Sequence, residues 1–274
     1  MGTSVLAALA HSLASNQIRI IDLTQTLAPS FPTIALPPEM GQCWPFRIEE
    51  ISRYDDRGPG WYWNNFSCGE HTGTHFDAPI HWISGKDLPN NATDTIPVEA
   101  FIGPACVIDC SREAAADPDY LLTVDAIRAW EVRHGTIPPR AWLLMRTDWS
   151  KRTDPVAYQN FDETGQHTPG PDVAAVRFLV EERNVIGFGT EAIGTDAGQA
   201  NYLRPPYPCH YFMHGGFFDA VGKHVRWVLP MFTRADVARI RATPESEWKP
   251  NELVACVWWI SPNLTLAHEY YGLI

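Results

Sequence analysis

Four side chains that can bind a metal ion or carry a proton lie within eleven consecutive residues of this chain. They are His71, His75, Asp77 and His81, in the segment HTGTHFDAPIH. Two imidazoles and one carboxylate leave coordination positions open for water and substrate, as catalytic metal sites do and structural sites do not. A water held by such an ion can lose its proton near neutral pH. The segment therefore predicts a catalytic metal site.

The spacing of the first three residues explains how they can converge on one ion. His75 and Asp77 are two residues apart, so in an extended backbone both side chains lie on the same face. His71 joins them if the backbone turns between, and Gly73 makes such a turn sterically inexpensive. These three side chains are therefore candidate metal ligands.

His81 follows this group closely and suits a different role. Pro79 stiffens the intervening backbone and would direct His81 back toward the cluster. An imidazole titrates near neutral pH, so a histidine beside the metal that is not needed as a ligand suits proton transfer. The alternative is that all four groups are ordinary side chains beside turn glycines. Their concentration within eleven residues argues against that interpretation.

Alternating strands and helices are expected to position this segment. Runs rich in β-branched and aromatic residues predict strands, and apolar residues at helical spacing predict helices. Strands are expected at residues 18–23, 46–52, 60–67, 106–110, 141–146 and 185–189, with the second and third paired around a turn at 55–59. Helices are expected from residue 5, at 123–134 between Thr123 and Gly135, and at 171–183 with Pro171 in the first turn. The order of elements from 105 to 190 indicates βαβ units with parallel strands, followed by an ordered loop at 190–208.

The composition limits the class of protein. The chain has 274 residues, 45% of them hydrophobic, which suits a substantial core in a single domain spanning residues 1–274. A net charge of −11 disfavours nucleic acid or an anionic membrane as a partner. No segment approaches the roughly 20 apolar residues of a spanning helix, and the N-terminus lacks the basic region of a signal peptide. We therefore expect a cytoplasmic protein whose cysteines are reduced and mostly buried.

The eleven-residue segment also carries a resemblance. It fits the pattern H-x-G-T-H-x-D-x-P-x-H of the cyclase-like family of metal-dependent hydrolases, whose members include bacterial kynurenine formamidases and isatin hydrolases. Other stretches resemble family segments as well, and together they cover roughly residues 18–215. They are IDLT at 21–24, DTIP at 94–97, the run at 103–109, LMRTDWS at 144–150, GFGTEAIGTDAG at 187–198 and YPCH at 207–210.

The resemblance implies a fold and a set of roles. The fold is α/β, of the swivelling β/β/α type, with a mixed central sheet or barrel-like β core flanked by helices. The positions of His71, His75 and Asp77 bind the metal, zinc or manganese in different members. His81 matches the catalytic acid/base, and His210 matches the distal histidine that faces the substrate or a second metal.

The resemblance also narrows the number of metals and the substrate. Two-metal members have a bridging glutamate twelve residues after the distal histidine, where this chain has Gly222, so one divalent ion is expected. The implied substrate is a small aromatic amide, formamide or lactam, in tryptophan, kynurenine or indole catabolism, and the implied assembly is a homodimer or larger homo-oligomer. The candidate substrate pocket consists of Phe31, Trp61, Trp63 and His214. Glu191 and Asp196, in the Gly-rich loop, have two interpretations: groups that support the site residues from behind, or solvated or capping residues, of which we favour the second.

Two alternatives come from other functional classes. His75-x-Asp77 with a distal His210 resembles the ligand triad of non-haem iron oxygenases. Those enzymes have an all-β jelly roll and an Arg about ten residues after the distal His, whereas Arg226 follows here at sixteen. The second alternative is a catalytically silent metal- or ligand-binding relative, because residues 216–274 diverge from the family pattern. That tail still contains a predicted strand at 253–260.

Overall fold

The computed structural model describes residues 4–36 and 38–215. The predicted strand at 253–260, and the interpretations that rest on Gly222 and Arg226, lie outside the described residues. The chain divides into two compact units, Met1–Phe76 and Asp77–Ile274, and each is described by itself. The boundary falls inside the HTGTHFDAPIH segment. None of the helices in the described part of the chain has the length and apolar character needed to cross a membrane.

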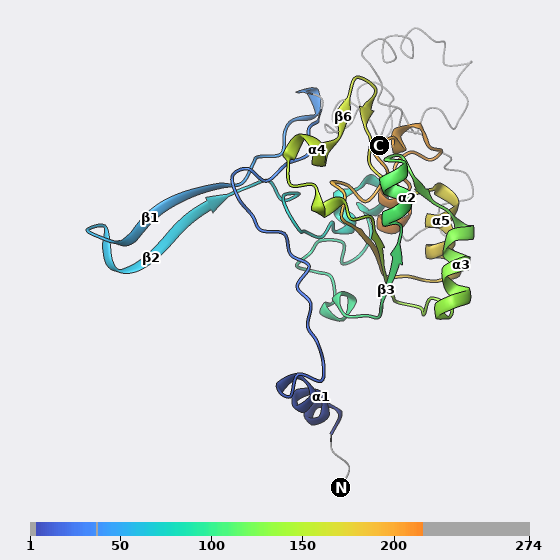
Figure 1. Ribbon diagram of the computed structural model, residues 1–274, viewed down its shortest axis with the longest axis horizontal. Helices are drawn as coiled ribbons and strands as arrows, with labels where there is room; N and C mark the ends of the chain where they lie inside the picture. The colour runs from blue at the N-terminus through green and yellow to red at the C-terminus, as the bar shows by residue number, and fades with distance from the viewer. Residues whose placement is uncertain (1–3, 37, 216–274) are drawn as a thin grey trace. The chain divides into compact units, whose positions relative to one another are not determined.

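The first unit contains one α-helix and a β-hairpin. Helix α1 (Val5–Ala14) begins after Ser4, whose hydroxyl accepts a hydrogen bond from the Ala7 N–H at 3.2 Å. Strands β1 (Arg47–Asp55) and β2 (Gly58–Ser67) form the antiparallel pair predicted from the sequence, seen as a long two-stranded ribbon in Figure 1. Asp55 pairs with Gly58, so a two-residue turn connects the strands. A 3₁₀ turn at Pro38–Met40 precedes the hairpin.

The strand predicted at residues 18–23 is absent, and that prediction is wrong. The segment belongs to no helix or strand, and the side chains of Ile20, Ile21 and Leu23 are mostly exposed. Isoleucine favours an extended backbone, but a strand also needs a neighbour for its hydrogen-bond ladder. Among the described residues, no strand pairs with this segment.

The second unit is built on a parallel sheet in the order β3-β5-β9, formed by Ala105–Asp109, Trp142–Arg146 and Gly187–Thr190. The strands match the three predicted between residues 105 and 190. Helix α3 (Val124–His134) connects the first two strands between the predicted caps. Thr123 accepts from the Ala126 N–H, and Gly135 ends the helix with φ +90°, a conformation that glycine adopts without steric cost. The mixed α/β class is therefore confirmed.

The helix predicted at 171–183 begins later and is shorter than expected. Helix α5 spans Val173–Arg177, and a π-helical turn continues it over Phe178–Glu182. Asp172 is the N-cap, and its carboxylate accepts from the Ala175 N–H at 2.5 Å. Pro171 therefore lies before the helix, where it pairs with Leu122 in a short parallel ladder. The prediction of Pro171 in the first helical turn is wrong because the aspartate, a stronger capping residue, sets the start.

The remaining elements of the second unit are short. They are α2 (Ser111–Ala116), α4 (Pro155–Gln159), the two-residue strands β4 (Leu121–Leu122), β6 (Phe161–Asp162), β7 (Gly165–Gln166) and β8 (Gly170–Pro171), the 3₁₀ turns at Pro79–His81, Ile83–Gly85, Val98–Phe101, Trp149–Lys151 and Ala200–Tyr202, and the π-helical turn η8 (Cys209–Met213). Strands β4 and β8 pair in parallel, and β6 and β7 pair antiparallel. The ordered loop predicted at 190–208 is present, with one 3₁₀ turn in it.

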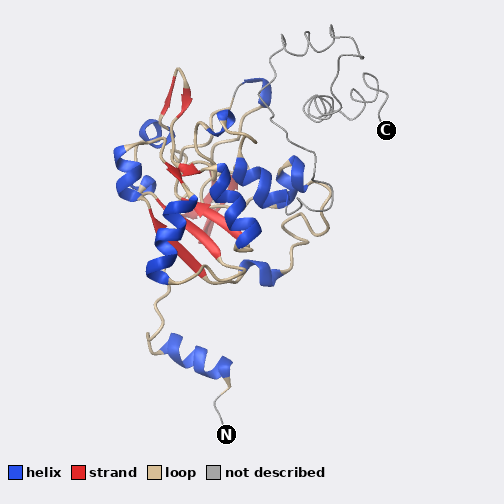
Figure 2. Cartoon of the chain, turned by 90° about the vertical axis from the view of Figure 1, so that its right-hand side faces the viewer, coloured by secondary structure: helices blue, strands red, loops and turns tan. Residues whose placement is uncertain are grey.

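The core of the second unit lies between the parallel sheet and its helices, which cover one face of the sheet in Figures 1 and 2. Cys106 and Ile108 on β3 are buried, and they pack in one cluster with Ile127 of α3 and Leu179 after α5. Val107 points the other way and is 48% exposed. Strand β3 is therefore buried on one face, as an alternating pattern requires.

A partly buried ion pair stabilises this layer of helices. The Arg183 guanidinium donates two hydrogen bonds to the Glu131 carboxylate, at 2.6 and 2.9 Å, and the Ile137 N–H donates a third at 2.9 Å. Pairing with Arg183 lowers the pKa of Glu131 from 4.5. The lowered value means that the pair stabilises the fold fully above pH 4.5, and that this contribution is lost as the pH falls through the folded pKa.

Replacing Glu131 by glutamine should lower the free energy of unfolding by about 2–3 kcal/mol, because Arg183 would keep its charge in a largely buried position without a carboxylate. Urea denaturation at pH 7 measures the effect. Glu181→Gln is the matched control, since Glu181 pairs with Arg177 at an exposed helical i,i+4 position that contributes about 0.5 kcal/mol or less. Equal losses in the two variants would contradict the prediction.

Candidate metal centre

The first unit carries two of the predicted ligands, His71 and His75. Between them Gly73 has φ +74°, the left-handed turn that the sequence predicted there. A Cβ at this position would meet the end of the Leu27 side chain, which would have to shift, and the positive φ would strain any residue other than glycine. The turn brings the two imidazole rings to a centroid separation of 5.2 Å, nearly perpendicular at 83°.

One hydrogen bond fixes which nitrogen of His75 is available to a metal. Its Nδ1 lies 2.7 Å from the carbonyl oxygen of Gly73. A carbonyl oxygen only accepts, so Nδ1 carries the proton and donates. In the neutral ring Nε2 then keeps its lone pair, which is the arrangement of most metal-binding histidines. The local backbone of HTGTH therefore sets the tautomer of His75.

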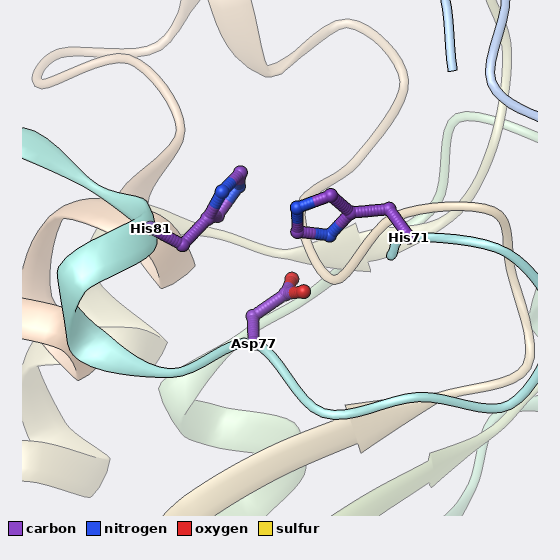
Figure 3. Close-up of side chains that lie close together, drawn as sticks. All are labelled: His71, Asp77 and His81. Atoms are coloured by element: carbon purple, nitrogen blue, oxygen red, sulfur yellow. The ribbon is translucent and has the colours of Figure 1, made fainter. Parts of the chain in front are cut away.

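The second unit begins with Asp77 and brings His81 to it. A 3₁₀ turn over Pro79–His81 follows Ala78, with the proline at its first position. Figure 3 shows the Asp77 carboxylate and the His81 ring directed into the same space. Asp77 and His81 are both potential metal ligands in the described part of the chain. Pro79 begins the turn that brings His81 to Asp77.

Two further histidines of the second unit lie close to Asp77 and His81. His210 and His214 lie one turn apart at η8, with ring centroids 5.4 Å from each other. The His81 ring lies 5.6 Å from His210 and 5.9 Å from His214. Nε2 of His210 is 4.0 Å from an oxygen of Asp77. The structure therefore brings His210 and His214 to Asp77 and His81.

His214 is held neutral by its surroundings. Burial lowers its pKa to about 4, and His210 and His81 act in the same direction, while Asp77 opposes them. A neutral imidazole adds no positive charge beside a cation site. The same region is therefore compatible with a divalent ion.

Asp196 supports His210, the less favoured of the two roles that the sequence left open for it. Its carboxylate is almost fully buried, with 4% of the side chain exposed, and accepts from His210 Nδ1 at 2.6 Å. It also accepts from the N–H groups of Cys209 and His210 at 2.7 and 3.2 Å. Asp196 therefore does cap a turn, as interpreted, but it is not solvated and it binds a site histidine. The signal in the sequence was its place in a Gly-rich segment before His210.

Glu191 has the capping role interpreted for it. Its carboxylate accepts from the backbone N–H groups of Thr147, Asp148 and Ser150 at 3.0 to 3.2 Å, and from the Ser150 hydroxyl. The loop after β5 is thereby fixed to the loop after β9. Glu191 stabilises the edge of the sheet without touching the histidines by any contact found in the described residues.

Of the residues predicted to line an aromatic pocket, three lie in the first unit and His214 lies in the second. Phe31 lies in a turn of the first unit, and Trp61 and Trp63 lie on β2 with 52% and 55% of their surface exposed. Core packing is the other interpretation of such aromatic residues, and their half-exposed positions do not fit it. An aromatic residue that the sequence analysis did not select, Trp82, lies with its ring centroid 4.7 Å from His210. Its position directly after His81 was the available signal.

The donor groups fit a divalent metal ion. Imidazole nitrogens and a carboxylate oxygen suit zinc and manganese. Two of the rings, His75 and His210, use Nδ1 in hydrogen bonds to oxygen acceptors. Such hydrogen bonds orient metal-binding imidazoles in general.

Comparison with known proteins agrees with this geometry. The cyclase family, described as "Putative cyclase", matches residues 21–197. The chain is 48% identical over 213 residues to an isatin hydrolase of Roseibium aggregatum, covering 77% of this chain and 81% of that protein. It is 27% identical over 128 residues to a kynurenine formamidase of Salinibacter ruber, covering 45% and 56%. The solved structure of isatin hydrolase A from Ralstonia solanacearum is similar with a TM-score of 0.77 and 58% identity, covering 79% and 82%.

Proposed function

The chain belongs to the cyclase family, and on that premise we propose that it opens the lactam ring of isatin or a close analogue by hydrolysis. The reaction breaks the C–N bond between the lactam carbonyl and the ring nitrogen. Water supplies a hydroxyl to the carbon and a proton to the nitrogen, so that a carboxylate and an aromatic amine result. Hydrolysis of a non-peptide C–N bond is also the reaction class of its formamidase relatives.

The choice of a lactam over a formamide rests on the degree of similarity. Identity to the isatin hydrolase of Roseibium aggregatum is 48% over most of both chains, whereas identity to the kynurenine formamidase is 27% over about half. The single observation that carries the reaction class is the convergence of Asp77, His81 and His210 in the second unit. A carboxylate ligand, a proton carrier and a distal histidine are the groups that metal-assisted hydrolysis needs.

One divalent ion, zinc or manganese, is proposed to be held by His71, His75 and Asp77. Such an ion would lower the pKa of a bound water toward ~7 and polarise the substrate carbonyl. The protein orients this set through the Gly73 turn and through the hydrogen bond that places the His75 proton on Nδ1. His214, neutral because of burial, adds no charge that would oppose a cation.

The remaining histidines would handle the proton and the substrate. His81 lies at the end of the turn that Pro79 begins, and its ring is directed into the same space as the Asp77 carboxylate. It accepts the proton from the attacking water and returns it to the leaving nitrogen, as a general base and then a general acid. The His210 ring lies 5.6 Å from the His81 ring. Trp82, whose ring centroid is 4.7 Å from that of His210, offers an aromatic surface for a planar ring. Phe31, Trp61, Trp63 and His214 stay predictions as substrate contacts.

Hydrolysis assays on isatin and on N-formylkynurenine, with the enzyme loaded with Zn²⁺ or Mn²⁺, test the proposal. We expect turnover of isatin with at least one of the two metals and a kcat/KM for isatin above that for N-formylkynurenine. The reverse preference would reassign the substrate as a formamide. No turnover of either, with metal bound, would support the catalytically silent alternative.

The oxygenase alternative loses its structural basis, because the second unit has a parallel α/β sheet where that alternative needs a jelly roll. A homodimer or larger assembly, a cytoplasmic location and a role in indole or tryptophan catabolism stay predictions. Sedimentation of the purified full chain measures the first of these directly.

A further inference from the structure

We propose that Asp196 is a positioning residue that makes His210 a hydrogen-bond acceptor at the reaction site. It does so by holding the proton of the neutral imidazole on Nδ1, so that the lone pair of Nε2 faces Asp77. Only the expected effect on kcat rests on the proposed function, in which His210 lies beside the reacting groups. The tautomer itself is a property of the folded chain.

The hydrogen-bond geometry assigns the proton. Oδ2 of Asp196 lies 2.6 Å from Nδ1 of His210, and a carboxylate oxygen only accepts, so Nδ1 must donate. A neutral imidazole has one N–H, which leaves Nε2 as an acceptor 4.0 Å from Asp77 Oδ2. A ring with the opposite tautomer would present an N–H there instead. Asp196 therefore decides whether His210 can accept a proton from water or only donate one.

The carboxylate is itself held firmly enough to orient the ring. Its two oxygens accept the backbone N–H groups of Cys209 and His210 at 2.7 and 3.2 Å, and its side chain is 4% exposed. Trp82 packs against the His210 ring at 4.7 Å. Rotation of His210 would break a short hydrogen bond in a buried setting, which is costly. The ring is thus fixed in direction as well as in tautomer.

Asparagine at position 196 preserves size and disturbs this arrangement. Its NH₂ group must replace one of two accepting oxygens, and each of those oxygens faces an N–H donor. At the Oδ2 position it would donate to Nδ1 and favour the tautomer with the proton on Nε2. We therefore expect Asp196→Asn to lower kcat for isatin by on the order of a hundredfold, the upper range for loss of a carboxylate that orients a site histidine, with metal content unchanged.

A double-mutant cycle separates positioning from folding. In a His210→Gln background, Asp196→Asn should cause no further loss of kcat, because its target is absent. Asp172→Asn is the matched control, since Asp172 caps α5 through Ala175 N–H. Both aspartate variants should lower Tm, and only Asp196→Asn should lower kcat. A kcat within twofold of wild type, or an equal loss in the His210→Gln background, would overturn the proposal.

A spectroscopic measurement holds even if isatin is not the substrate. Histidine-selective ¹⁵N labelling of the Zn²⁺-loaded protein, with the His210 signals identified by their loss in His210→Gln, reports which ring nitrogen carries the proton. We expect a protonated Nδ1 in the wild type and loss of that state in Asp196→Asn. A protonated Nε2 with a bare Nδ1 in the wild type would refute the positioning role. Correct tautomers without isatin turnover would instead refute the proposed substrate alone.

Discussion

Asp77→Asn should abolish stoichiometric metal binding and lower kcat/KM for isatin by about a thousandfold or more. Asp77 supplies the one carboxylate among the three proposed ligands, and the neutral amide that replaces it is a weaker ligand for a divalent cation. Loss of the ion removes several kcal/mol of transition-state stabilisation, and each 1.4 kcal/mol corresponds to roughly tenfold in rate. The side chain is 16% exposed and of the same size as asparagine, so the fold should persist.

Metal content per chain and kcat/KM, measured on the same preparations, check this result. Asp87→Asn is the control, because Asp87 lies ten residues on with 80% of its side chain exposed and pairs only with Lys86 among the ion pairs found in the described residues. We expect that control to keep both metal and activity. An Asp77→Asn protein with one metal per chain and normal turnover would show that Asp77 is not a ligand.

His81→Ala should lower kcat by about 10²- to 10⁴-fold while the metal stays near one per chain. Removing a general acid/base costs a factor of this size, and none of the three proposed ligands is lost. A kcat that falls far more than KM changes would place the defect in the chemical step. Elemental analysis with steady-state kinetics on isatin makes the measurement.

His134→Ala is the matched histidine control for this variant. His134 lies in the last turn of α3 and packs its ring 4.7 Å from Trp130, so its loss should leave kcat unchanged. If His81→Ala instead loses its metal, His81 is a ligand and not the proton carrier. That outcome is a sharp test, because His81 is one of the potential metal ligands in the described residues.

Local signals explain which elements could be predicted. The helix at 124–134 has a threonine cap, apolar spacing and a terminal glycine in adjacent positions, so short-range sequence determines it. The parallel strands follow from buried apolar runs that alternate with helices. Residues 18–23 have the same propensity as those strands, but pairing depends on a distant partner. Propensity alone therefore gave a wrong strand.

The site residues also divide into those that short-range sequence could predict and those that it could not. The turn at Gly73 and the placement of His81 by Pro79 depend on residues within the segment, so its spacing was informative. Asp196 is fourteen residues from His210, and only the fold of the loop between them brings the two together. An aspartate in a Gly-rich loop is most often a capping residue, so the sequence favoured that interpretation. Its second role is visible only in three dimensions.

The buried cysteines of the second unit can report local unfolding of this part of the chain. Cys106, Cys110 and Cys209 are buried free thiols, and burial raises the pKa of Cys110 to about 12 and that of Cys209 well above its usual value. Thiol reagents attack the thiolate, so these positions should resist alkylation while the fold is closed. Cys209 is adjacent to His210, and its modification rate would report how often the turn that carries the distal histidine unfolds. Alkylation followed by mass spectrometry could therefore measure the rate of local unfolding at the turn that carries His210, without an added label.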